Sequence, residues 1–132
     1  MIYETATDFE INQSVAWALG CHTLPVIDGD IDVFIVPLDE PQIFDPCNSW
    51  ADAGPIIVEN RISVLHSSEY RYKSAEWEAK TTRYIDDPNK DYVDEISEKL
   101  GHMSGTVKLY NASDINPLRA AMVVFLKMKE AE

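Results

Sequence analysis

The stretch FDPCNSWADAGPIIVENRISVLH, residues 44–66, constrains the fold more than any other part of the chain. Asp45 precedes Pro46, and the proline ring disfavours a helical conformation in the residue before it, which predicts a turn. Ser49 lies three residues before Asp52 and can accept a hydrogen bond from a free amide at a helix start. The stretch therefore predicts a helix that begins near Ser49.

Pro55 lies inside this helix, which the sequence predicts over residues 50–60. Proline lacks an amide proton and its ring clashes with the carbonyl four residues earlier, so we expect the helix to kink or restart there. After Asn60 and Arg61, the β-branched run at residues 62–65 predicts a strand. We expect this strand to pack against the helix before it.

Capping signals predict two further helices. Thr7 and Glu10 form a capping box and Gly20 is suited to a left-handed helix end, which predicts a helix over residues 8–19. Its expected inner face consists of Ile11, Val15, Ala18 and Leu19. Asn116 and Pro117 are a cap and a first helical residue for a final helix. The expected inner face of this helix consists of Leu118, Ala121, Met122 and Phe125.

Two strands joined by a turn are predicted between the first two helices. Residues 23–27 and 31–37 are apolar and β-branched, and they flank the turn signal Asp28-Gly-Asp30. The following segment LDEPQIFD, residues 38–45, is polar and contains proline. It predicts a surface connection and a candidate binding loop.

Further strands and an acidic excursion are predicted after the central helix. Alternation over residues 73–81 is typical of a half-buried strand, and it places Trp77 in the core. Residues 106–110 predict another strand. Between them, residues 84–104 form an acidic excursion with a short helix.

These elements predict an α+β fold in a single domain over residues 1–132. We expect a mostly antiparallel sheet of about four or five strands, forming a single layer covered by three principal helices. The first and last of these helices should share one face of the sheet. The order of the elements does not divide into βαβ units, which argues against a parallel doubly wound sheet.

Charge is distributed unevenly along the chain, whose net charge is −12. Residues 1–60 contain eleven Asp or Glu and no Lys or Arg, whereas residues 61–132 contain twelve acids and eleven bases. This disfavours direct binding to nucleic acid and favours either a basic partner or solubility alone. Since no apolar run approaches the about 20 residues of a membrane span and no leader pattern opens the sequence, we expect a cytoplasmic protein without a membrane partner.

The sequence contains no catalytic or cofactor motif. Cys47 with His66 or His22 and Asp45 is the best nucleophilic set, because a thiolate needs a base and an orienting acid. A helix start after Cys47 could lower its pKa, but the spacing of these residues does not support the set. With Cys21 the same residues supply metal-ligand types without a paired spacing. We therefore expect no enzyme, cofactor or metal site, and a cysteine-dependent enzyme is the less favoured alternative.

Four sequence blocks resemble a known protein family. They are DFEIN at 8–12, FDPCN at 44–48, PIIVENRISV at 55–64 and NPLRAAMVVFL at 116–126. Together they resemble the NinX family of lambdoid phages over most of the chain except the acidic excursion. The resemblance implies a small phage accessory protein without an agreed activity, in the cytoplasm of a bacterial host. In that family a Trp directly precedes the Pro of the third block, whereas Gly54 stands there in this chain and Trp50 lies one turn earlier.

Binding is the function class that remains, in two versions. In the first, a pocket near residues 44–48 and the start of the last helix sequesters a small nucleotide-like signal of host defence, with helix amino termini as anion sites. In the second, the acidic amino-terminal half binds a host protein, as a decoy of a nucleic-acid-binding surface would. The candidate binding residues are Asp45, Asn48, Trp50, Asn60, Arg61, Asn116 and Arg119. Each has a simpler structural interpretation, such as helix capping by Asn48 and Asn116, and the sequence leaves a homo-oligomer open.

Overall fold

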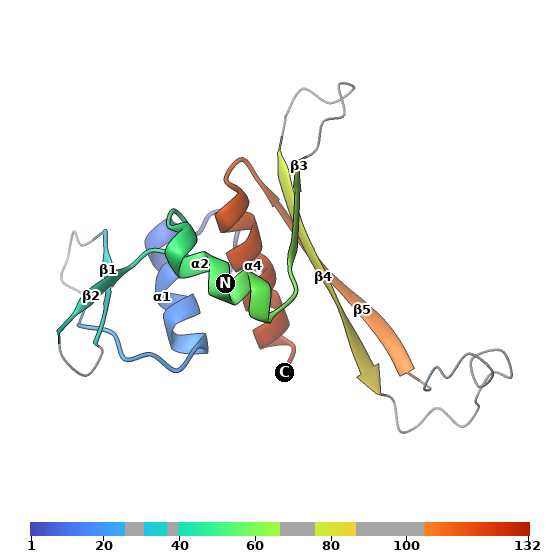
Figure 1. Cartoon of the computed structure of the whole chain (residues 1–132), viewed down its shortest axis with the longest axis horizontal. Helices are drawn as coiled ribbons and strands as arrows, with labels where there is room; N and C mark the ends of the chain where they lie inside the picture. Colours follow the sequence, from blue (N-terminus) through green and yellow to red (C-terminus); the bar gives the residue numbers. More distant parts are fainter. Residues whose placement is uncertain (26–30, 37–39, 67–75, 87–104) are drawn as a thin grey trace, which may run out of the picture.

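The computed structural model of the chain describes residues 1–25, 31–36, 40–66, 76–86 and 105–132 (Figure 1). These residues form three helices and five strands, which confirms the α+β class. The strands belong to two antiparallel sheets instead of the single sheet expected. No helix in the described ranges is long and apolar enough to cross a membrane. Residues 87–104, which include the predicted short helix, lie outside the described residues.

Helix α4, Pro117–Glu130, occupies the centre of the fold. Figure 1 shows it between helices α1 (Asp8–Ala18) and α2 (Trp50–Glu59) on one side and the larger sheet on the other. All four residues of its predicted inner face are buried. Five further residues of the helix are also buried: Ala120, Val123, Val124, Leu126 and Met128. A helix covered on both sides buries most of its circumference, which the one-sided pattern did not predict.

The larger sheet consists of β3 (Ser63–His66), β4 (Trp77–Asp86) and β5 (Gly105–Asp114), in that order and antiparallel throughout. Helix α4 packs against all three strands. Helix α1 packs on α4 and on the smaller sheet, so the first and last helices do not share a sheet face as we expected. The helix that covers the sheet is therefore itself the support for the other two helices.

Trp77 lies outside the core, contrary to the prediction. The alternation correctly identifies the next two inward positions, because Ala79 and Thr81 are buried. Trp77, however, is the first residue of β4 and is partly exposed. Its ring meets the ring of the exposed His66 edge-on, with the centroids 4.8 Å apart. A period-2 pattern predicts which side chains of a strand point toward the core. It does not predict how far along the strand the covering helix extends.

The smaller sheet pairs β1 (Val33–Ile35) with β2 (Gln42–Phe44). The second strand falls in the segment 38–45 that we expected to be only a surface connection. The prediction failed because Phe44 is buried opposite Val33 and fixes this part of the segment against the core. We predicted that residues 23–27 and 31–37 pair as two strands. In the described residues of these segments, an isolated antiparallel bridge joins Thr23 to Ile35. The turn at residues 28–30 lies outside the described residues.

Helix α1 begins and ends where the capping signals place it. Thr7 Oγ1 accepts a hydrogen bond of 3.1 Å from the Glu10 amide, and Gly20 has φ +80° just after the helix. The predicted inner face is correct for Ile11 and Val15 and wrong at its carboxyl end, where Leu19 is 42% exposed. The helix instead buries Asn12 and Ala16. The reason for the polar residue is a contact with residues 44–48, described below.

Helix α2 runs without a restart through Pro55, contrary to expectation. Ser49 caps it as predicted, since its hydroxyl accepts from the Asp52 amide at 3.4 Å. The proline removes one hydrogen bond, to the carbonyl of Ala51 in the first turn, and both residues are exposed to water that can solvate that carbonyl. After the helix, Arg61 turns the chain into β3 with φ +54°.

The different burial of two aromatic residues predicts different costs of truncation. Phe125→Ala removes a side chain that is 1% exposed and should lower the free energy of unfolding by about 3–5 kcal/mol. Trp77→Ala, at the start of β4, should cost clearly less, because that residue is only partly buried. Urea denaturation of both variants measures the difference. Equal losses would show that Trp77 is a core residue after all.

Candidate functional site

The loop at residues 44–48 is joined to the start of α4 by Asn116. The Asn116 Nδ2 donates 2.7 Å to the Cys47 carbonyl and 3.3 Å to the Asn48 Oδ1. Its Oδ1 accepts from the amides of Leu118 at 2.9 Å and Arg119 at 3.3 Å, which caps the helix. One amide side chain therefore starts α4 and fixes the loop beside it.

The same loop is joined to α1 by the buried Asn12. Its Nδ2 donates 2.8 Å to the Asp45 Oδ1, and its Oδ1 accepts 3.0 Å from the Cys47 amide. The Asp45 amide donates 2.9 Å to the Asp52 carboxylate, which links the loop to α2 as well. Asn48 Nδ2 donates 3.2 Å to Asp8 and 3.1 Å to Asp45. The loop thus holds three helices together through amides and carboxylates.

Arg119, in the first turn of α4, connects this network to the amino terminus. Its side chain is 14% exposed; its Nε donates 3.0 Å to Asp114 and its Nη1 donates 2.6 Å to Asp8. Its Nη2 donates to the carbonyls of Tyr3, at 3.1 Å, and Ala6. The guanidinium is therefore already engaged by two carboxylates and two carbonyls.

A hollow of about 370 Å³ opens beside this network. It is lined by Thr7, Asp8, Phe9, Asn12, Ile31, Asp32, Asp45 and Asn48. Three of these are carboxylates and none is basic, and the volume falls within the range of small-ligand sites. The walls are therefore suited to a cationic group with an apolar stem.

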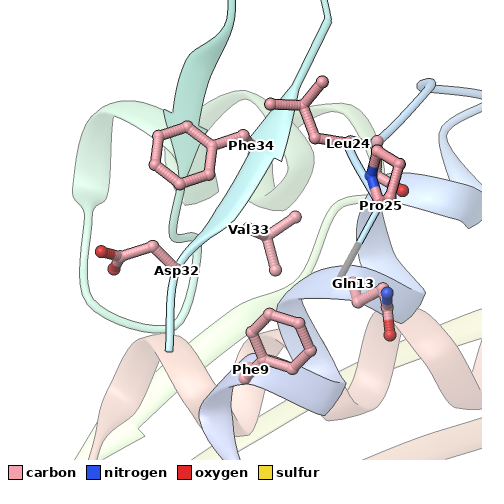
Figure 2. A pocket seen from close by; sticks show the side chains of 8 residues that line it. Phe9, Gln13, Leu24, Pro25, Asp32, Val33 and Phe34 are labelled. Atoms are coloured by element: carbon pink, nitrogen blue, oxygen red, sulfur yellow. The ribbon is translucent and has the colours of Figure 1, made fainter. Parts of the chain in front are cut away.

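A second, much smaller crevice adjoins the hollow and shares Phe9 and Asp32 with it. Figure 2 shows Phe9 and Gln13 of α1 facing Val33, Leu24 and Pro25. Its volume is about 10 Å³, which is room for about one water molecule. Of these two spaces, the larger hollow is therefore the one that a ligand group could enter.

The structure divides the seven candidate residues. It brings Asp45, Asn48, Asn116 and Arg119 into one network. Trp50 begins α2 nearby and is 62% exposed. Asn60 and Arg61 lie at the other end of α2, where Asn60 Nδ2 donates 2.8 Å to the Ile56 carbonyl. They do not join the other five residues.

Sequence reasoning missed four residues of the site, namely Asp8, Asn12, Asp32 and Asp114. Asp8 and Asp114 are ordinary surface acids in the sequence, and only the fold brings both to Arg119. Asn12 did carry a signal: it follows Ile11 on the helix side that packs inward, where a polar residue needs a buried partner. Asp32 falls in the segment 31–37 that we predicted only as a strand, and it lines the hollow.

Cys47 is fully buried, and burial raises its pKa from an ordinary value of 9.0 to about 12. The carboxylate of Asp8 adds to this rise. This contradicts the idea that the following helix lowers the pKa, because desolvation outweighs the helix dipole here. His22 and His66 are exposed, and neither donates to Cys47 among the described residues. No group of three or more metal-ligating side chains is found in the described part of the chain.

Comparison with known proteins gives one result. The family model described as Bacteriophage P22, NinX matches residues 3–98 of the chain. No match is found among curated proteins. The match contains three of the four blocks noted in the sequence and most of the acidic excursion. It ends before the fourth block, residues 116–126, although this block builds α4 and supplies Arg119.

Arg119→Met should lower the free energy of unfolding by about 2–4 kcal/mol, because it removes the cationic donor shared by two carboxylates and two carbonyls. Arg83→Met is the matched control, since Arg83 pairs with Glu132 at 2.9 Å with both side chains 45% exposed. The control should cost less than about 1 kcal/mol. Chemical denaturation of both variants tests this, and equal losses would contradict the central role of Arg119.

Cys47 should not react with a thiol reagent in the folded protein, whereas the partly exposed Cys21 should. Because the pKa of Cys47 is raised in the folded state, its contribution to stability is full below pH 9 and is lost as pH rises toward 12. Counting modified thiols with and without urea, and measuring unfolding across that alkaline range, checks both statements. Rapid labelling of Cys47 at neutral pH without urea would contradict them.

Proposed function

The chain belongs to the NinX family of phage proteins, and from that premise we propose an accessory protein that acts without catalysis, by binding a basic surface of a host protein. The proposal places this action in the bacterial cytoplasm and the partner among proteins of host defence. A nucleic-acid-binding surface is the kind of basic surface that an acidic protein can occupy as a decoy.

The observation that carries the proposal is the acid-lined hollow. Asp8, Asp32 and Asp45 line it, and they belong to an amino-terminal half with eleven acids and no Lys or Arg. Carboxylates in a concave site focus a negative potential, which attracts a basic partner and speeds its association. Phe9 and Ile31 in the same wall offer apolar contact to the stem of a Lys or Arg side chain.

The alternative, sequestration of a nucleotide-like signal, has less support. The donors of Arg119 are engaged by acids and carbonyls, and Arg61 lies at the far end of α2. The amides that begin α2 and α4 are capped by Ser49 and Asn116, so a phosphate would have to displace these caps among carboxylates. An anion is therefore the wrong charge class for this hollow.

A pair of charge reversals tests the proposal. Tagged protein expressed in the host is recovered under native conditions, as wild type, as Asp32→Lys and as Glu130→Lys. Asp32 is exposed in the hollow, whereas Glu130 is exposed at the end of α4, and both substitutions change the net charge equally. We expect a stoichiometric host protein with wild type and with Glu130→Lys, and its loss with Asp32→Lys.

The association should also weaken steeply with added salt, because it depends on partly exposed charges. Two results would contradict the proposal. One is a nucleotide released from the purified protein on heat denaturation. The other is turnover of an offered substrate that Cys47→Ala abolishes.

A further inference from the structure

Helix α2 is apolar around almost its whole circumference, although only one side of it is buried. Ala53 and Ile56 face the core and pack toward α4. The opposite side carries Trp50, Ala51, Gly54, Pro55 and Val58, which we call the α2 outer face. Trp50 is 62% exposed and Val58 is 76% exposed. A helix that is apolar on two opposite sides is normally covered by protein on both of them.

The outer face is uncharged over two turns of the helix. The charged residues of the helix lie beside this face, Asp52 in the first turn and Glu59 at the last helical position. Exposed apolar residues that occur singly need no explanation, but a contiguous group on one helix marks an interaction surface. A basic partner would find no carboxylate across this face, so the charge reasoning for the acid-lined hollow does not apply here.

The order of residues on the outer face suits a second copy of the same chain. Gly54 is at its centre, with Trp50 four residues before it and Val58 four residues after it. If two α2 helices cross antiparallel about a twofold axis at Gly54, Trp50 of each copy meets Val58 of the other. A Cβ built on Gly54 has no atom within 4 Å, so this position leaves space for a close approach of two helices.

Charges at the two ends of α2 complement each other in this arrangement. Arg61, just beyond the carboxyl end, is exposed and forms no ion pair with any described residue. Asp45 and Asp52 lie at the amino end. The antiparallel crossing brings the Arg61 of each copy toward the acidic amino end of the other α2 helix. The two helix dipoles are also antiparallel in this arrangement, which is favourable.

We propose that the protein forms a twofold homodimer in which the α2 outer faces pack on each other around Gly54. Apart from Asp45 at its edge, the residues that line the acid-lined hollow belong to other parts of the chain than α2 and lie outside this interface. The dimer also accounts for a helix whose residues are apolar on both sides, because one side packs in the protomer and the other between protomers.

Sedimentation equilibrium of the full chain, from low micromolar to near-millimolar concentration, tests the proposal. The wild type should show a monomer–dimer equilibrium. Gly54→Gln should raise the dissociation constant by about tenfold or more, since it places a long side chain at the crossing point. Arg61→Gly should raise it by a smaller factor, because it removes the charged contact.

Both substitutions leave the monomer fold intact on physical grounds. Gln is a better helix former than Gly at position 54, and Gly accepts the φ of +54° at position 61 more readily than Arg. Thermal unfolding at a concentration where wild type is monomeric should therefore show no loss in either variant. A loss of dimer with an intact fold supports the interface directly.

Val107→Glu is the matched control on another exposed apolar surface. Val107, in β5, is 65% exposed and does not belong to α2. This variant should dimerise like wild type. The proposal is overturned if wild type stays monomeric over the whole range, if Gly54→Gln dimerises unchanged, or if Val107→Glu dissociates the dimer instead.

Discussion

The guanidinium of Arg119 is the interaction on which the other contacts of the site depend. A cation that is 14% exposed needs nearly all of its donors satisfied, and here the partners come from three parts of the chain: the amino-terminal segment, the start of α1 and the end of β5. Its position in the first turn of α4 places a positive charge next to amides that already favour anions. The surrounding carboxylates therefore gather at this end of the central helix.

The loop at residues 44–48 is held at the same end of α4 by asparagine side chains. Asn12, Asn48 and Asn116 each donate and accept, so they can connect carboxylates and backbone groups that would otherwise repel or remain unpaired. The network fixes α1 and α4 relative to each other, and two of its members, Asp8 and Asp45, also line the hollow. Structural hydrogen bonding and a negative binding surface are consequently built from the same residues.

Two surfaces of different chemistry follow from this architecture. The hollow is concave and acidic, and it suits a partner of opposite charge. The α2 outer face is convex and uncharged, and it suits a surface like itself. Because a chain with a net charge of −12 repels its own copies, self-association needs a face without that charge, and α2 provides one.

The sequence by itself determined the starts of the three helices, the α+β class and the family, because these depend on local signals. Thr7, Ser49 and Asn116 cap helices through bonds within three residues, and alternation placed Ala79 and Thr81 inward. Tertiary structure alone decided that Trp77 lies at the edge of the core and that Phe44 pairs in a second sheet. It also decided that Arg119 meets Asp8, which lies more than a hundred residues earlier in the chain. Local patterns state which side of an element is apolar, whereas the partner that covers this side is fixed by packing between distant segments.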